Sequence, residues 1–336
     1  MPTKSSPMAD MNPSPAIDVR NLTKRYPQSK SNAVDSVSFE VGRGEIFGLL
    51  GPNGAGKTTT IGVLTTAVVP TGGEASIMGF DVIHDQTRVK QRIAVVPQRS
   101  NLDRSLLVRE ILTFHAAYHG VARREREAQA DQLLKELGLY DRRNEKADRY
   151  SGGMSQRLMI ARALMHQPDV LFLDEPTNNL DPQSRLFLWE RIRALNEQGL
   201  TILLTTHDMD EADHLCQRIA IMDLGKILVN DTPAELKKLI PGGNSLELRV
   251  ETGEPARLTE RFGTLPGVTK VEEVPGKESE AEEGVTSFHV YAAEAGALVG
   301  EAAQMILESG ARVRDIRVRQ ASLEEVFIYL TGKHLR

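Results

Sequence analysis

The sequence predicts an α/β fold built on a largely parallel β-sheet, followed by a small C-terminal α+β domain. Two observations predict the sheet. The strand-like run 45–50 leads into a glycine-rich loop and a helix-forming run, and the apolar run 170–173 ends in two carboxylates. Polar residues after buried strands are typical of a crevice at the carboxyl edge of a parallel sheet. The third observation is the alternation of strand and helix patterns after residue 243. A length of 336 residues agrees with two domains.

The glycine-rich loop matches the pattern G-x-x-x-x-G-K-[ST]. Its residues are Gly51, Pro52, Asn53, Gly54, Ala55, Gly56, Lys57 and Thr58, with Thr59 next. The glycines let successive backbone N–H groups face one concavity, and the helix that follows adds its positive end. Lys57 can reach the β- and γ-phosphates, and the Thr58 hydroxyl can bind Mg²⁺. The loop therefore predicts a site for a nucleoside triphosphate.

The two carboxylates after the run 170–173 are Asp174 and Glu175. Downstream of a phosphate-binding loop, the first is expected to hold Mg²⁺, directly or through water. The second could polarise the attacking water. A GTPase would also carry an N-K-x-D guanine-binding motif. The nearest string, at 144–148, has an inserted glutamate and does not match.

A second anion-binding helix start lies about twenty residues before the Asp-Glu pair. Ser151, Gly152 and Gly153 open the helical run 156–165, which is the composition of a helix N-terminus that can face a phosphate. With these motifs in this order, the chain resembles the nucleotide-binding subunits of ABC transporters. Their signature usually reads Leu-Ser-Gly-Gly-Gln, whereas this chain has Tyr150 and Met154 at its ends. That variant resembles exporters of the daunorubicin-resistance and nodulation type.

The resemblance covers roughly residues 17–232 and implies further roles. Gln98 matches the Q-loop glutamine that contacts Mg²⁺ and the attacking water, and Asp181 stands in the D-loop, which crosses a dimer interface. His207 matches the switch histidine that contacts the γ-phosphate, and Tyr26 stands where an aromatic ring stacks on adenine. The residues expected to carry the site are catalytic Glu175, His207 and Gln98, the magnesium ligands Thr58, Gln98 and Asp174, and the signature Ser151, Gly152 and Gly153, which closes on ATP bound by the other copy of a homodimer.

Composition restricts the partners. The net charge of -5, without a basic stripe interleaved with aromatic residues, argues against nucleic acid. The lone Cys216 allows no internal disulfide and fits a reducing cytoplasm. No apolar run approaches the roughly 18 residues that span a bilayer. If the chain drives transport, a separate multi-span permease must supply the pathway, and we expect the chain to be peripheral at the cytoplasmic face of the membrane.

The domain organisation follows from changes in pattern. Residues 1–15, rich in Ser, Pro and Met, are expected to form a disordered arm. Residues 16–240 form the predicted ABC ATPase domain, with a helical subdomain at about 99–165, where apolar residues recur at helical spacing. Within it, His115 and His119 lie four apart, a spacing that can bind metal. Because no H-E-x-x-H pattern accompanies them, we interpret them as a pair on a helix surface.

The tail, residues 244–336, forms the predicted accessory domain. Strand patterns at 246–250, 268–274, 285–291 and 313–318 alternate with helical patterns at 255–262 and 296–307, and a last helix is expected at 323–330. The order β-α-β-β-α-β is typical of a ferredoxin-like domain. The acidic stretch 278–284 is expected to be a solvated linker. The sequence leaves open whether the domain regulates, contacts a second copy or is passive.

The sequence thus predicts an ATP-binding and ATP-hydrolysing subunit of an ABC exporter, for a drug, antibiotic, lipid or saccharide. An alternative is a non-transport ABC ATPase in DNA repair or translation. That class usually carries a long coiled coil or two ATPase halves, and neither pattern is present. A metabolic P-loop kinase would have no use for Ser151, Gly152 and Gly153.

Overall fold

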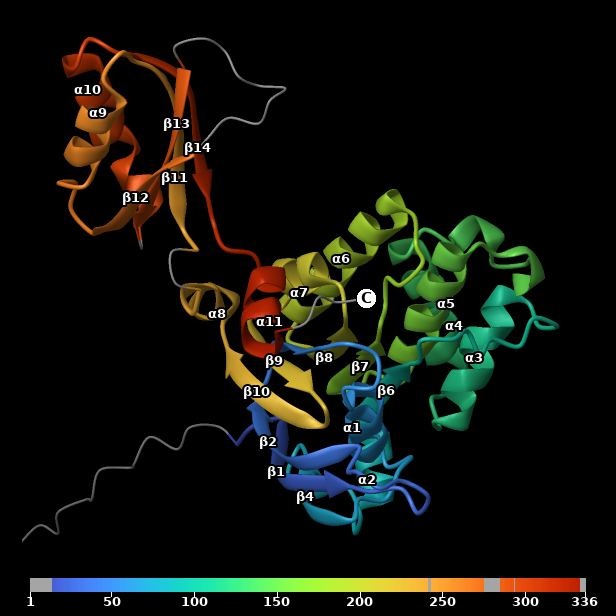
Figure 1. Cartoon of the computed structure of the whole chain (residues 1–336). Helices are drawn as coiled ribbons and strands as arrows, with labels where there is room; N and C mark the ends of the chain where they lie inside the picture. The colour runs from blue at the N-terminus through green and yellow to red at the C-terminus, as the bar shows by residue number, and fades with distance from the viewer. Residues whose placement is uncertain (1–13, 241–242, 275–284, 293, 333–336) are drawn as a thin grey trace, which may run out of the picture. The chain divides into compact units, whose positions relative to one another are not determined.

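The computed structural model describes residues 14–240, 243–274, 285–292 and 294–332. The predicted arm lies almost entirely outside these ranges, as does the acidic stretch 278–284. The chain divides after Thr232 into two compact units (Figure 1). The first contains every residue predicted to bind nucleotide.

A six-stranded sheet forms the centre of the first unit, in the order β10-β9-β3-β8-β7-β6. Strands β3, β6, β7, β8 and β9 pair in parallel, and β10 pairs antiparallel with β9. Their bounds are Ile46–Leu50 (β3), Ile93–Val96 (β6), Val170–Asp174 (β7), Thr201–Thr206 (β8), Arg218–Asp223 (β9) and Lys226–Asp231 (β10). Every residue of β3, β7 and β8 is buried. Burial accounts for the apolar runs 46–50 in β3, 170–173 in β7 and 202–204 in β8.

A second sheet of four antiparallel strands packs against the first. Its order is β2-β1-β4-β5, with bounds Ile17–Lys24 (β1), Val34–Val41 (β2), Gly72–Ile77 (β4) and Phe80–Asp81 (β5). One buried apolar cluster includes side chains from both sheets. At its centre the rings of Phe39 and Phe47 stack with centroids 5.2 Å apart. The alternation of buried and exposed residues along β2 is the pattern of a strand with one face on the core.

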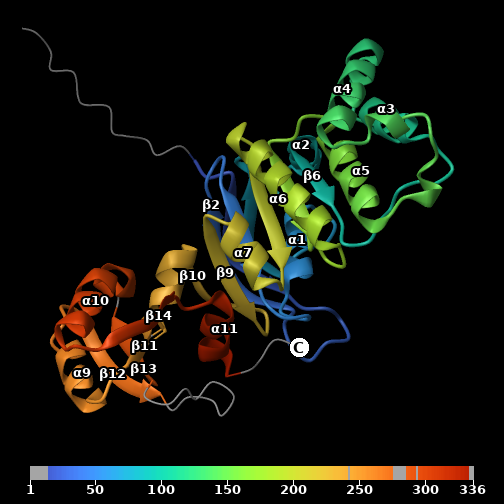
Figure 2. The same ribbon diagram turned by 90° about the horizontal axis from the view of Figure 1, so that it is seen from above.

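Three helices of the first unit pack together: α3 (Val108–Tyr118), α4 (Arg123–Glu136) and α5 (Gly152–Leu164). Figures 1 and 2 show them as a group beside the sheets. Between α4 and α5 the chain forms two short 3₁₀ turns, η1 (Tyr140–Arg142) and η2 (Ala147–Arg149). They occupy the region predicted to be helical. The remaining helices of this unit are α1 (Lys57–Leu64), α2 (Gln86–Arg92), α6 (Pro182–Glu197) and α7 (Met209–Leu215).

The second unit contains a four-stranded antiparallel sheet in the order β12-β13-β11-β14. Its elements are α8 (Pro233–Lys238), β11 (Ser245–Glu251), α9 (Pro255–Phe262), β12 (Val268–Val274), β13 (Val285–Ala292), η3 (Ala295–Leu298), α10 (Val299–Glu308), β14 (Arg312–Arg319) and α11 (Leu323–Thr331). The order of strands and helices is the one predicted, and the sheet order is that of a ferredoxin-like domain. The helix expected from residue 296 begins instead as the 3₁₀ turn η3, in which the Ala297 N–H donates to the Glu294 carbonyl.

Among the described residues, no helix combines the length and the apolar character needed to cross a bilayer.

Candidate nucleotide-binding site

The loop between β3 and α1 is shaped by glycines that no other residue could replace. Gly54 and Gly56 adopt positive φ angles of 84° and 108°, in a region that favours glycine. A Cβ on Gly56 would lie 2.4 Å from the Ala33 carbonyl oxygen, and one on Gly51 would lie 2.3 Å from that of Met222. The loop can therefore curl tightly against its neighbours and deliver the chain into α1, whose N-cap is Gly56. The result is a set of backbone donors at a helix N-terminus.

The ammonium group of Lys57 lies inside this curl. Its Nζ donates to the Gly51 carbonyl at 2.6 Å and to the Pro52 carbonyl at 3.2 Å, and it lies 3.8 Å from Glu175 Oε1. The side chain is 5% exposed. Burial lowers the pKa of Lys57, and the charges of Glu175 and Asp174 oppose that shift. A buried cation held by carbonyl oxygens and two acids is a group that a polyphosphate could bind in their place.

Asp174 ends β7 and faces the start of α1. Its Oδ2 lies 3.5 Å from the hydroxyl oxygen of Thr58, and its Oδ1 accepts a hydrogen bond from the Thr205 hydroxyl. Thr205 lies on β8, directly opposite Asp174 in the parallel register. The structure thus brings together two hard oxygen donors from separate segments, Thr58 and Asp174. Oxygen donors of this kind are the ligands that Mg²⁺ accepts in proteins.

Glu175 is held in place by more contacts than any other predicted site residue. Its φ is 48°, a left-handed conformation that costs a non-glycine residue about 1–3 kcal/mol. Its N–H donates to the Thr205 carbonyl at 3.0 Å. Its Oε2 accepts hydrogen bonds from Gln98 at 2.7 Å and Asn178 at 2.9 Å. On the other side, His207 Nδ1 lies 3.3 Å from Oε1. The strained backbone and the amide donors fix the direction of the carboxylate.

The structure therefore brings Lys57, Gln98 and His207 each into contact with Glu175, and it places Thr58 beside Asp174. Tyr26 lies apart from this cluster: its side chain is 41% exposed, and the Lys24 ammonium lies 5.1 Å from its ring centroid. Its ring is thus accessible on the surface of the first unit.

Ser151, Gly152, Gly153 and Asp181 make their contacts away from Lys57 and Glu175. Ser151 is the N-cap of α5, and its hydroxyl accepts from the Met154 N–H at 3.2 Å. A Cβ on Gly153 would lie 2.6 Å from the Ser184 hydroxyl oxygen, so the start of α5 packs closely on the start of α6. Asp181 is the N-cap of α6, and its hydrogen bonds with Ser184 lower its pKa. Ser151 and Gly152 are exposed.

Three residues of the network were not found by sequence reasoning. Asn178 donates to Glu175, and Thr205 donates to Asp174. Glu211, buried on α7, accepts from the Thr177 hydroxyl at 2.6 Å and from Trp189 Nε1 at 3.3 Å. Burial raises the pKa of Glu211. It joins the segment after Glu175 to the helix after His207. The sequence places Thr205 at the end of a strand, which suggests a place near the site. That its hydroxyl bonds to Asp174, however, depends on the register between β7 and β8.

Comparison with known proteins agrees with this geometry. The model of the protein family described as "ABC transporter" matches residues 34–178 of this chain. The daunorubicin resistance ATP-binding protein DrrA2 of Streptomyces coeruleorubidus is 40% identical to this chain. The alignment covers 94% of this chain and 95% of DrrA2. A Nod factor export ATP-binding protein I of Burkholderia thailandensis is 38% identical, covering 95% and 98%. The linearmycin resistance ATP-binding protein LnrL of Bacillus subtilis is 33% identical, covering 95% and 99%.

Solved structures agree as well. An ATP-binding subunit of an ABC transporter is 30% identical, with a TM-score of 0.61 over 67% of this chain and 92% of that one. A dimeric ATP-binding cassette bound to ADP and phosphate after hydrolysis is 28% identical, with a TM-score of 0.59 over 64% and 98%. The chain belongs to the ATP-binding subunits of ABC transporters, among the exporter ATPases. It binds ATP and is an ATPase, and the predicted family and fold are confirmed.

The network predicts a specific loss of stability for Thr205→Val. This change keeps the shape of the side chain but leaves the buried Asp174 oxygen without its donor, which should lower the free energy of unfolding by about 1–3 kcal/mol. The matched control is Thr60→Val. The Thr60 hydroxyl is also buried, but its acceptor, the Gly56 carbonyl, keeps a bond from the Thr60 N–H at 2.9 Å. The fluorescence of the single Trp189 in denaturant reports unfolding of the first unit. Equal losses in both variants would contradict the assignment.

Proposed function

We propose that this chain is the ATP-hydrolysing motor of an exporter. Two copies close on two ATP molecules, and the movement drives a separate membrane permease. The observation that carries the proposal is the cluster in which Lys57, Gln98 and His207 surround the buried carboxylate of Glu175. A lysine that can bind phosphate and an oriented carboxylate are the two groups that hydrolysis of a triphosphate requires.

In this proposal the loop from Gly51 to Thr59 holds the phosphates, and Lys57 exchanges the Gly51 and Pro52 carbonyls for phosphate oxygens. The exposed ring of Tyr26 stacks on adenine. Glu175 accepts the proton of the attacking water, while Gln98 and Asn178 hold its carboxylate in position.

His207 lies on the far side of the same carboxylate and contacts the γ-phosphate. When bound, Mg²⁺ would be held by Thr58, Asp174 and Gln98 and would neutralise charge on the phosphate oxygens. The Thr58 hydroxyl and the Asp174 carboxylate, with oxygens 3.5 Å apart, are hard donors of the kind that such an ion prefers.

The exposed start of α5 supports a site shared between two copies. Ser151 and Gly152 present a helix N-terminus to the exterior, and among the described residues it forms no hydrogen bond with Lys57 or Glu175 of the same copy. A second copy could place this N-terminus against the γ-phosphate. Asp181, exposed at the neighbouring helix start, would then lie at the interface between the copies. The dimeric cassette among the similar structures supports this arrangement.

The names of the relatives support the proposed permease and place of action. They are named as ATP-binding proteins for resistance to daunorubicin and linearmycin and for Nod factor export. We therefore assign the chain to the cytoplasmic face of the cell membrane, moving a drug, antibiotic, lipid or saccharide, without nucleic acid as a partner. The domains we assign are an N-terminal arm (1–15), the ATPase domain (16–240) with its helical subdomain (about 99–165), and an accessory domain (244–336). A role in DNA repair or translation is the alternative.

The first prediction separates binding from chemistry. Glu175→Gln should keep ATP binding and slow hydrolysis by about 10² or more, because a positioned general base contributes roughly 10²–10⁴. Lys57→Ala should instead lose both binding and turnover. Nucleotide binding by equilibrium dialysis and steady-state release of phosphate measure the two effects. Near-normal turnover in Glu175→Gln would remove the base assignment.

The second prediction concerns the shared site. A heterodimer of Lys57→Ala and Ser151→Arg contains one site in which an intact phosphate loop meets an intact signature. Each variant alone should be inactive, and the purified heterodimer should recover up to about half of the normal turnover. Ser151→Arg also removes a helix cap worth about 1 kcal/mol, so its unfolding transition is the control. A folded but inactive heterodimer would contradict the shared site.

The third prediction concerns the permease. Arg104 is exposed in the segment between Gln98 and α3, where we expect the contact. Arg104→Glu should uncouple transport in membranes containing the permease, yet leave the ATPase rate of the purified chain nearly unchanged. Arg109 is unsuitable for this test because it forms an ion pair with Asp131, 3.0 Å apart. The control is Arg124→Glu on the exposed face of α4. If the chain instead co-purifies only with ribosomes or DNA, and never with a membrane protein, a role in translation or DNA repair would be favoured.

A further inference from the structure

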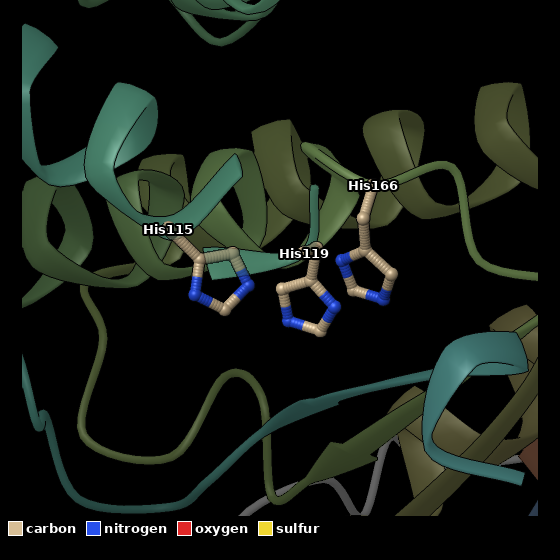
Figure 3. A group of neighbouring side chains, drawn as sticks. All are labelled: His115, His119 and His166. Atoms are coloured by element: carbon tan, nitrogen blue, oxygen red, sulfur yellow. The ribbon is translucent and has the colours of Figure 1, made fainter. Parts of the chain in front are cut away.

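Three histidines from two helices gather at one place in the first unit. His115 lies on α3, His119 is the C-cap of that helix, and His166 follows the C-terminus of α5 (Figure 3). Each ring offers one nitrogen as a ligand atom, and these three nitrogens all lie within 4.8 Å of one another. The sequence predicts that His115 and His119 form a pair on a helix surface. In the structure both are half-buried, and the His119 ring stacks on that of His166 with centroids 3.9 Å apart.

The protonation of His166 is fixed by its surroundings. Its Nε2 lies 2.9 Å from the Ile93 carbonyl oxygen, and a carbonyl can only accept, so Nε2 must carry the hydrogen. In the neutral ring Nδ1 then has the free lone pair. That atom is buried and has no hydrogen-bond partner among the described residues. A histidine that donates one N–H to a backbone carbonyl and presents its other nitrogen is the usual arrangement of a metal ligand.

The other two rings are also able to bind a cation. Burial is the main cause that lowers the pKa of all three histidines, in the case of His115 to about 4. At neutral pH the imidazoles are therefore uncharged, which is the form that coordinates metal. The side chains of His115 and His119 lie on one face of α3 because they are four residues apart.

We propose that His115, His119 and His166 form a binding site for a divalent transition-metal ion, of which Zn²⁺ fits these ligands best. Imidazole nitrogens are ligands suited to zinc, and three of them leave a fourth position for water. This site is separate from the residues that bind ATP and does not depend on the proposed transport function.

Binding requires a small rearrangement of the rings. Nitrogen atoms around a tetrahedral zinc ion lie about 3.3 Å apart, given a bond length of about 2.0–2.1 Å. The planes of His119 and His166 are inclined by only 9°, so their lone pairs cannot converge on one ion until the His119 ring turns out of the stack. His119 ends its helix and lines an open cleft together with Glu125 and His166, so its ring has room to turn.

Two charged side chains influence the affinity in opposite directions. The charge of Arg162, on α5, acts on His115 and disfavours a cation, although its guanidinium is bound to the Asn101 side chain and backbone carbonyl. Glu125, on α4, lines the same cleft as His119 and His166 and favours a cation. The bound ion would link the end of α3 to the segment after α5 and, through His166, to Ile93 on β6.

The test is zinc titration of the tag-free full-length chain by isothermal calorimetry, in excess Mg²⁺ to occupy the oxygen ligands of the nucleotide site. We expect one Zn²⁺ per chain at this site. His119→Asn and His115→Asn should each weaken binding about tenfold or more, because losing even an outer partner of a metal ligand costs 10–100-fold. Neither side chain forms a hydrogen bond with the described residues, so these variants should fold.

Two control variants show where the ion binds. His84→Asn changes an exposed histidine away from the cluster and should leave the affinity unchanged. His207→Asn changes the histidine beside Glu175 and should also leave it unchanged. A Co²⁺-substituted chain should show the visible absorption of a tetrahedral site, and His119→Asn should remove it. Unchanged zinc affinity in His115→Asn and His119→Asn, or loss of the site in His207→Asn alone, would overturn the proposal.

Discussion

The rest of the site depends on the buried ammonium of Lys57. Removing such a charge from water costs several kcal/mol even after the protein relaxes, and burial lowers the pKa of this group accordingly. The cation is tolerated because Glu175 lies 3.8 Å away and the Gly51 and Pro52 carbonyls accept its hydrogens. A triphosphate brings more negative charge than Glu175 does. We therefore propose that it replaces Glu175 as the partner of Lys57, which would leave the carboxylate free to act on water.

The parallel register of three strands places these groups together. Leu50 on β3 lies opposite Thr206 on β8, and Asp174 on β7 lies opposite Thr205. The glycine loop, Glu175 and His207 therefore all begin at the same edge of the sheet. The left-handed backbone at Glu175 turns its side chain back towards Lys57, and the bond from its N–H to the Thr205 carbonyl holds that turn. The strain is thus supported by the strand that also carries His207.

Part of this arrangement could be predicted from the sequence. Lys57, Asp174 and Glu175 follow buried apolar strands. For each of them, the type of side chain and its place after a strand therefore indicated the same role. Gln98 and His207 came only from the family resemblance, because a lone glutamine or histidine after a strand carries no signal of its own. Asn178 and Thr205 could not be predicted, since their partners depend on a left-handed turn and on strand register. His166 was missed for a similar reason: packing of α3 against α5, and no sequence spacing, brings it to His115 and His119.

We propose that one copy of the chain holds an incomplete site, which a second copy closes when ATP is bound. Sedimentation velocity of the slow variant Glu175→Gln measures this closure. With ATP and Mg²⁺ we expect a dimer, because the α5 N-terminus of each copy gains a phosphate to contact. With ADP we expect a monomer, because the γ-phosphate is missing. A species that remains monomeric while ATP is demonstrably bound would rule out the shared site.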